Sequence, residues 1–252
     1  MARYFKAEVL KLRHNHLVRA IWLFPLIGIL VALGFSALGG TEILKLSDET
    51  IINHWSIIWI NALIATLAGT IDRNEKKSTR YMIYSGRAVS LSRIELTRIG
   101  LIAVMSLIST LIVSVGLILN SLWLDTPSIT SLGNCLLAVG VIWLTTLWQI
   151  PFCLWLSRKT ILYIPIILNT LAPLLMGTGI ATTDSWLIFP YAWDLRILMP
   201  ITRMHINGIP LPANSPFLSS QSIPLGLTLC LVCFVVLSGL ASWSFKRQEI
   251  TK

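Results

Sequence analysis

The sequence is poor in charged residues: only 12% of its 252 residues are Asp, Glu, Lys or Arg, and only 11 residues are acidic. A soluble protein of this length carries about twice that charged fraction. Composition therefore excludes the one or two soluble domains that length alone would allow. The longest intervals between the apolar runs are 72–98 and 181–222, and neither is long enough for a separate catalytic domain.

Motifs for catalysis and for energy coupling are also missing. There is no glycine-rich phosphate loop followed by Lys, and no Ser/His/Asp constellation or metal cluster has suitable spacing. No apolar run has an acid at its centre, which most proton- or sodium-coupled carriers need, and no inverted repeat of interrupted helices is visible. We therefore expect a chain that is not an enzyme and binds no metal or cofactor itself. If it transports, its energy comes from a partner.

Cysteine is scarce, and all four cysteines lie inside apolar runs. Cys230 and Cys233 have the spacing of a redox motif, but they lie in the middle of a hydrophobic run with no strand before them. We interpret the four cysteines as small buried thiols.

Long apolar runs are what the sequence has in abundance. It is 55% hydrophobic and its mean hydropathy is +0.75. Runs of about 20 apolar residues recur, and this is the length a helix needs to cross a bilayer. We predict an all-α polytopic membrane protein, with residues 1–252 forming a single transmembrane domain. Its six predicted spans are 20–38, 51–71, 99–119, 132–156, 161–180 and 223–245.

The residues before the first span, 1–19, carry five basic residues and one acid, Glu8. Phe5, Val9 and Leu12 recur at helical spacing, which predicts an amphipathic helix lying in the membrane interface. The alternative is a basic flank that only holds the first span in place.

The segment 72–98 is the only long charged stretch between two apolar runs, and it holds seven of the twenty Lys and Arg residues. Tyr81 and Tyr84 belong to a short apolar stretch between its charge clusters. A charged segment with an apolar centre is typical of a short helix that packs into a groove on another protein. A basic loop on lipid headgroups is the alternative. Residues 90–98 predict a second short helix that enters the third span.

The basic residues also predict the topology. Seventeen of the twenty lie in the two tails, in 72–98 or in the connection 158–159, and only Lys45, Arg196 and Arg203 lie on the other side. The positive-inside rule therefore places both termini and the segment 72–98 in the cytoplasm. Nucleic-acid binding is disfavoured because these residues flank apolar spans and form no free-standing patch.

Three amide side chains lie within predicted spans: Asn61, Gln149 and Asn169. In hydrocarbon they must face protein or a cavity, so they either line a pathway or join helices by hydrogen bonds, and we favour the second. Pro151 predicts a local break in the fourth span, and Pro173 predicts one in the fifth.

The segment 181–222 is rich in Pro and Trp, and its apolar pieces are too short to cross a bilayer. It predicts irregular, re-entrant or interfacial helices on the outer face. Aromatic side chains there offer a stacking surface and Asp194 a counter-charge for an amphipathic, cationic ligand. An interfacial aromatic belt is the alternative. The candidates for contact with a substrate are Trp186, Tyr191, Trp193, Asp194 and Arg196.

Several stretches carry a likeness to a known family. They are Phe5, Glu8, Lys11 and Arg13 at the start, residues 72–77 after the second span, and 190–193, Arg196, Pro200 and 207–210 in the outer segment. Together with the six spans, this pattern resembles an ABC-2 type permease, and more narrowly the permease subunits of lantibiotic-immunity ABC transporters.

The resemblance implies a membrane subunit of a multi-subunit exporter in a bacterial plasma membrane, expelling an antimicrobial peptide for self-protection. The region 72–98 would be the coupling helix region for a cytoplasmic ABC ATPase, present in two copies and carrying the ATP and Mg²⁺. A second permease chain, identical or related, would complete the complex. The alternatives are a permease for another drug, lipid or polymer, and a non-transporting sensor or scaffold. The implied coupling residues are Asp72, Arg73, Glu75, Lys76, Lys77, Arg80, Tyr81 and Tyr84.

Overall fold

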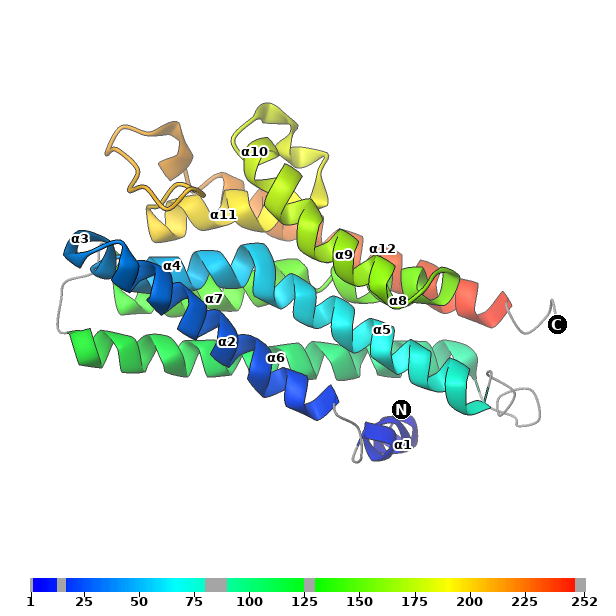
Figure 1. Ribbon diagram of the computed structural model, residues 1–252. Helices are drawn as coiled ribbons and strands as arrows, with labels where there is room; N and C mark the ends of the chain where they lie inside the picture. The colour runs from blue at the N-terminus through cyan, green and yellow to red at the C-terminus, as the bar shows by residue number, and fades with distance from the viewer. Residues whose placement is uncertain (1, 13–16, 80–89, 125–129, 248–252) are drawn as a thin grey trace.

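The computed structural model describes residues 2–12, 17–79, 90–124 and 130–247. These residues form an elongated helical bundle (Figure 1), and their only β pairing is an isolated bridge between Met204 and Pro210. Within this part of the chain, five helices are long and apolar enough to cross a membrane, or six if one bent pair counts as a single span. The chain therefore has the helices of a polytopic membrane protein.

The described elements follow one another along the chain. In order they are α1 (Ala2–Leu12), α2 (Leu17–Leu38), α3 (Thr41–Leu44), α4 (Ser47–His54), the π-helix η1 (Trp55–Trp59), α5 (Ile60–Thr79), α6 (Leu91–Leu124), α7 (Leu132–Thr146), α8 (Gln149–Lys159), α9 (Tyr163–Ala172), the π-helix η3 (Pro173–Gly177), α10 (Thr178–Ile180), the 3-10 helices η4 (Asp184–Leu187) and η5 (Pro190–Ala192), α11 (Trp193–Thr202), the 3-10 helix η6 (Pro216–Leu218) and α12 (Ser222–Arg247).

The predicted spans coincide with helices, with an interruption between α7 and α8 in the fourth and a later start, at Tyr163, in the fifth; most of the other helices run beyond the predicted ends. The second span runs through α4, η1 and α5, and the third, α6, has 34 residues. At a rise of 1.5 Å per residue α6 is about 51 Å long, well over the roughly 30 Å of a hydrocarbon core. The prediction of a helix over 90–98 is confirmed, because α6 begins at Leu91. The stretch 41–50, which lies between the first two predicted spans, is also largely helical, since α3 and the start of α4 occupy it.

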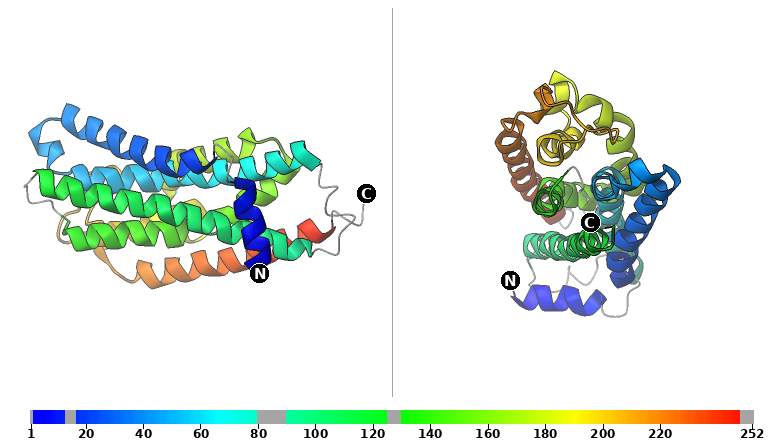
Figure 2. Two further views of the ribbon diagram at one scale, coloured as in Figure 1. Left: turned by 90° about the horizontal axis from the view of Figure 1, so that it is seen from below. Right: turned by 90° about the vertical axis from the view of Figure 1, so that its left-hand side faces the viewer.

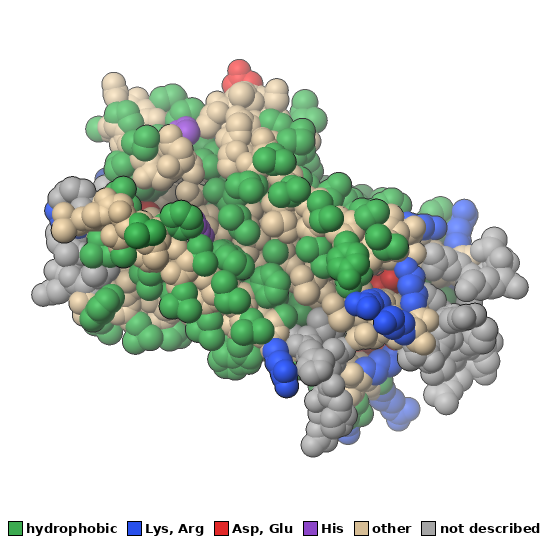
Figure 3. Space-filling view, viewed as in Figure 1, with side chains coloured by type: hydrophobic (Ala, Val, Ile, Leu, Met, Phe, Trp, Pro, Cys, Tyr) green, Lys and Arg blue, Asp and Glu red, His purple; other side chains and the backbone are tan. Residues whose placement is uncertain are grey.

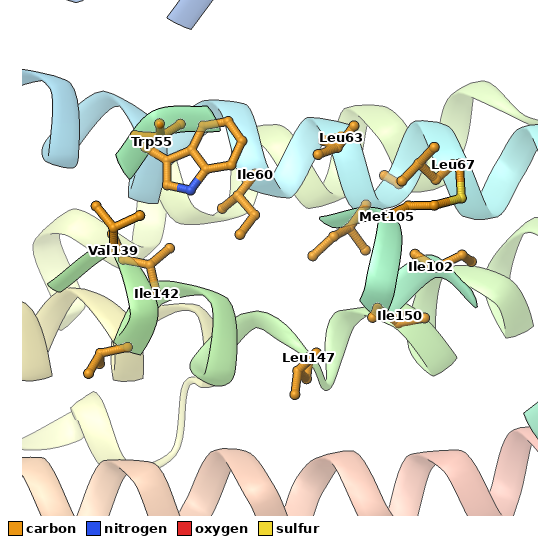
Figure 4. Packing of buried hydrophobic residues seen from close by; sticks show 14 of the residues in the cluster. Trp55, Ile60, Leu63, Leu67, Ile102, Met105, Val139, Ile142, Leu147 and Ile150 are labelled. Atoms are coloured by element: carbon orange, nitrogen blue, oxygen red, sulfur yellow. The ribbon is translucent and has the colours of Figure 1, made fainter. Parts of the chain in front are cut away.

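The core is built around α5, which packs against α2, α6, α8 and α9. Ile60, Leu63 and Leu67 of α5 face apolar side chains from α6, α7 and α8 in Figure 4. Ala65 and Ala68 are fully buried, and small residues let neighbouring helix backbones come close. Large apolar side chains on the outside of α2, α6, α9 and α12 stay exposed, as helices in contact with lipid require.

The two ends of the bundle differ. The helix α1 lies across the bundle near the end at which α12 ends (Figure 2), and Lys and Arg side chains gather at that end of the visible face (Figure 3). We call this the basic end. The segment 181–222, which contains α11, lies toward the opposite end and packs on α7 and α12.

The predicted irregularities take two forms. The fourth span bends by 41° between α7 and α8. Pro151 cannot donate to the carbonyl of Leu147, which instead accepts from the N–H of Ile150 at 3.1 Å. In the fifth span the break predicted at Pro173 is absent, because the wider π-helix η3 carries the helix through to α10.

Candidate functional site

A buried group of ion pairs joins α1, α5 and α6 at the basic end. The guanidinium of Arg98, whose side chain is 1% exposed, contacts the carboxylate of Glu75 at 2.8 Å and that of Glu8 at 3.5 Å. The ammonium of Lys11 lies 2.9 Å from Glu8 and 3.1 Å from Glu75. Two acids and two bases thus compensate one another; Glu8, Glu75 and Arg98 are buried, whereas the Lys11 side chain is 46% exposed.

A second ion pair joins α6 to α8 and reaches α12. Arg158 Nη1 donates to Glu95 Oε2 at 2.6 Å, and both side chains are almost completely buried. The Arg158 guanidinium lies 4.7 Å from the centroid of the Phe245 ring, and that of Arg98 lies 5.6 Å from it. Such cation–π contacts strengthen when they are desolvated. We call the whole group the ion cluster: Glu8, Lys11, Glu75, Glu95, Arg98 and Arg158.

The residues predicted for ATPase coupling fall into three groups. Asp72, Glu75 and Lys76 make contacts within the chain: Lys76 pairs with Asp72 at 3.0 Å and donates to the carbonyl oxygens of Ser157 and Arg158 at the end of α8. The Lys76 ammonium at the C-terminal end of α8 also interacts favourably with the negative end of that helix's dipole. Arg73 and Lys77 are exposed on α5. The remaining three, Arg80, Tyr81 and Tyr84, lie outside the described residues.

The three predicted amides meet in the middle of the bundle. Gln149 Nε2 donates to Asn61 Oδ1 at 2.7 Å, and Asn169 Nδ2 donates to Gln149 Oε1 and to the carbonyl of Asn61, both at 2.8 Å. All three are buried. Spans 2, 4 and 5 are therefore joined by neutral hydrogen bonds where lipid could not satisfy them.

The amides also connect to the segment 181–222, which the sequence did not reveal. The Tyr191 hydroxyl donates to Asn169 Oδ1 at 2.8 Å. Asn61 Nδ2 donates to the carbonyls of Ser56 and Ile57 in the π-helix η1. We call Asn61, Gln149, Asn169 and Tyr191 the amide cluster. The sequence predicted Tyr191 for contact with a substrate, but its hydrogen bond to Asn169 could have been found only by knowing that η5 folds back onto α9.

Asp194 lies next to this cluster and is only 4% exposed. It accepts a hydrogen bond of 3.2 Å from the Ser56 hydroxyl. Burial raises the pKa of the Asp194 carboxyl from an ordinary value of 3.8 to about 7, against a smaller lowering by hydrogen bonds from the Leu195 N–H and Ser56. Near neutral pH this carboxyl exists in both protonation states.

The other candidates for substrate contact are largely occupied within the chain. Trp186, Tyr191 and Trp193 are buried, and the last two pack edge-on against Trp148, with ring centroids 4.9 and 6.3 Å away. The half-buried Arg196 lies over the rings of Phe217 and Trp186 at 4.7 and 5.8 Å. In this conformation these side chains build the segment 181–222, and their contact with a substrate stays a prediction.

Two acids between the first two predicted spans, Asp48 and Glu49, are buried at the opposite end. Asp48 Oδ1 accepts from Asn120 Nδ2, and Glu49 Oε1 accepts from the Thr130 N–H, each at 2.8 Å. They tie the first turn of α4 to the end of α6 and the start of α7. The available signal was the pattern Ser-Asp-Glu at 47–49, since acids favour the first turn of a helix.

Among residues 2–12, 17–79, 90–124 and 130–247, no group of three His, Cys, Asp or Glu side chains lies close enough to hold a metal ion. The four cysteines are unpaired, and they lie on α7, α8 and α12. The buried polar groups described above join helices of this chain to one another.

Comparison of this chain with models of known families, with curated proteins and with solved structures gives no match.

Proposed function

We propose that this chain is the membrane subunit of an ABC-2 type exporter that expels a lantibiotic or related antimicrobial peptide, driven by a separate ATPase. The observation that carries the proposal is the ion cluster. It binds the two helices that flank 80–89, α5 and α6, to α1, α8 and α12.

The geometry suits the transmission of force from a cytoplasmic motor. Both α5 and α6 continue as helices into the charged region, to Thr79 and from Leu91. A partner that binds the connection between α5 and α6 and moves it would therefore move both helices as rigid bodies. Breaking a buried ion pair costs about 3–5 kcal/mol. The helices α5 and α6 therefore move together with α1, α8 and α12 and do not slide past them.

Orientation follows from charge. Lys and Arg gather at the basic end (Figure 3), and the positive-inside rule assigns that end to the cytoplasm, with both termini. The region 72–98 then faces the ATPase, which holds the ATP and Mg²⁺ and is present in two copies. A second permease chain, identical or related, completes the transporter in a bacterial plasma membrane.

The proposal that the cargo is a peptide is based on the family resemblance. One structural feature supports release of that cargo at the outer face. The segment 181–222 is hydrogen-bonded to spans 2 and 5 through Asp194 to Ser56 and Tyr191 to Asn169. A shift of these spans, started at the basic end, reaches the outer segment without a flexible link. That segment is where a peptide leaving the membrane would pass.

The proposal is tested by purifying the tagged chain from native membranes and identifying the proteins that come with it. We expect an ABC ATPase and a second six-span permease. Lys77→Glu combined with Tyr81→Ala and Tyr84→Ala should lower ATPase recovery more than tenfold without affecting membrane insertion. Arg19→Glu is the control, because it reverses an exposed charge outside 72–98. Recovery of the chain alone, or equal ATPase recovery with all variants, would contradict the proposal.

A further inference from the structure

A cavity of about 270 Å³ opens at the basic end between α5, the end of α8 and the start of α9. Its lining includes Arg73 and Lys76 from α5, Ser157 and Thr160 from the end of α8, and Tyr163 at the start of α9. None of these residues belongs to the ion cluster or the amide cluster.

The cavity has a defined structural origin. Gly69 of α5 faces the turn between α8 and α9, and a Cβ atom on Gly69 would lie 2.5 Å from Leu162 Cδ1. The glycine lets the start of α9 approach α5 closely. The turn is thereby held against the last helical turns of α5, and the space between them forms the cavity.

The cavity carries excess positive charge. Asp72 in its wall is neutralised by Lys76 at 3.0 Å. Arg73 is exposed and has no ion-pair partner among the described residues, and Lys159, next to the lining residue Thr160, is likewise exposed. The ten-residue helix α9 begins at the lining residue Tyr163, so the positive end of its dipole adds to this potential. The site therefore suits an anion.

The surroundings of the cavity are apolar on one side. Ile161 and Tyr163 are 63% and 59% exposed, and the exposed side chains Ile164, Ile167 and Leu168 continue along α9 toward the middle of the bundle. Tyrosine is typical of the level of the lipid headgroups. A soluble ligand would leave this apolar strip uncovered, whereas a lipid would cover it with its acyl chains.

From this arrangement we infer that the cavity binds the headgroup of an anionic phospholipid. The phosphate contacts Arg73 and the hydroxyl groups of the lining, and the acyl chains lie along the exposed face of α9. Basic pockets between membrane helices are known to take such headgroups. The site does not depend on the proposed exporter function, because it needs only this chain and a membrane.

The test measures lipid binding to the purified full-length chain by native mass spectrometry, with phosphatidylglycerol and phosphatidylcholine titrated separately. We expect the wild-type chain to prefer phosphatidylglycerol. Arg73→Gln and Lys159→Gln should each weaken that binding about fivefold, the usual contribution of one basic residue near an anionic headgroup, and leave phosphatidylcholine unchanged. Lys77→Gln is the matched control: it removes an exposed charge from the same helix outside the lining.

Location is tested with a photo-activatable phosphatidylglycerol, which should label the peptide that contains 157–163 in the wild type and much less in Arg73→Gln. Equal affinity of Arg73→Gln and Lys77→Gln for phosphatidylglycerol, or labelling elsewhere, would overturn the inference. Displacement of the lipid by millimolar inorganic phosphate would show a site for a free anion. If Arg73→Gln loses a co-purifying protein but keeps the lipid, the cavity is a protein-docking site and the inference is wrong.

Discussion

The amide cluster and the ion cluster both join helices to one another, but they use different kinds of polar contact. Each joins at least three helices through polar side chains that are mostly buried, yet the first contains only amides and a phenol and the second only ion pairs of acidic and basic residues. Asn61 lies in the middle of the long second span, whereas Glu75 lies near the end of α5. A charge at the centre of a bilayer costs about 2.5–3.5 kcal/mol or more, and this cost falls near the headgroups. Depth in the membrane therefore decides which kind of polar contact joins the helices.

The comparison also separates what each cluster contributes. Ion pairs are costly to break singly, since a lone buried charge remains, so they hold helix ends in one arrangement. Hydrogen bonds between amides in membranes are weaker, averaging about 0.6 kcal/mol each. The amide cluster thus leaves spans 2, 4 and 5 free to rearrange at moderate cost. The ion cluster keeps the basic end together while they do.

The largest effect is expected from breaking the ion cluster. Glu95→Gln leaves the Arg158 guanidinium buried without its counter-charge and should lower the free energy of unfolding by about 3 kcal/mol or more. The measurement is thermal or denaturant unfolding of the purified chain in detergent. The double variant Glu95→Leu with Arg158→Met removes both charges and should regain most of the loss. A single variant as stable as wild type would show that this pair does not hold the basic end together.

A smaller effect is expected from the amide cluster. Asn169→Leu removes two donated hydrogen bonds and the acceptor of the Tyr191 hydroxyl, and should cost about 2 kcal/mol in the same assay. Thr170→Val is the neighbouring control, because the Thr170 hydroxyl has no hydrogen-bond partner in the described structure and its loss should be neutral or slightly stabilising. If both variants behave alike, the amides contribute no specific connection.

The smallest effect is expected from Asp194, whose carboxyl can be neutral, like the amides, or charged, like the acids of the ion cluster. Its pKa is raised in the folded state to about 7, so the folded chain binds more protons than the unfolded chain above pH 4. Stability should therefore fall as pH rises through this range, by about 1 kcal/mol between pH 6 and 8 from this group. Asp194→Asn should remove that slope, whereas Asp184→Asn, which changes an exposed carboxyl, should retain it. An unchanged slope in Asp194→Asn would assign the pH dependence to another group.

The helices could be predicted from the sequence because their apolar runs are long, but their ends could not. Charge at 72–79 indicated a loop, yet ion pairs one turn apart, such as Asp72 with Lys76, continue α5 to Thr79. Charged residues end a membrane span without ending its helix. Likewise, Pro173 indicated a break because the sequence does not show that a π-helix can accommodate it.

The polar sites were predictable only in part, for a related reason. An amide in an apolar run stands out, so Asn61, Gln149 and Asn169 could be singled out before the structure placed them together. Tyr191 and Asp194 were singled out only for contact with a substrate, and their hydrogen bonds to Asn169 and Ser56 were not predicted. Their hydrogen-bond partners depend on how the outer segment folds back onto the spans. Such contacts between distant parts of the chain cannot be predicted from the residues next to them in the sequence.

The connection between α1 and the rest of the ion cluster has a consequence for biosynthesis. Lys11 pairs with Glu75, 64 residues later, and Glu8 with Arg98, later still. A ribosome adding 5–20 residues per second needs roughly 3–13 s to make the first of these partners available. Until then α1 cannot form these ion pairs, so it reaches its final position only after α2, α5 and the start of α6 have been made. Docking of α1 therefore depends on the earlier placement of α5 and α6.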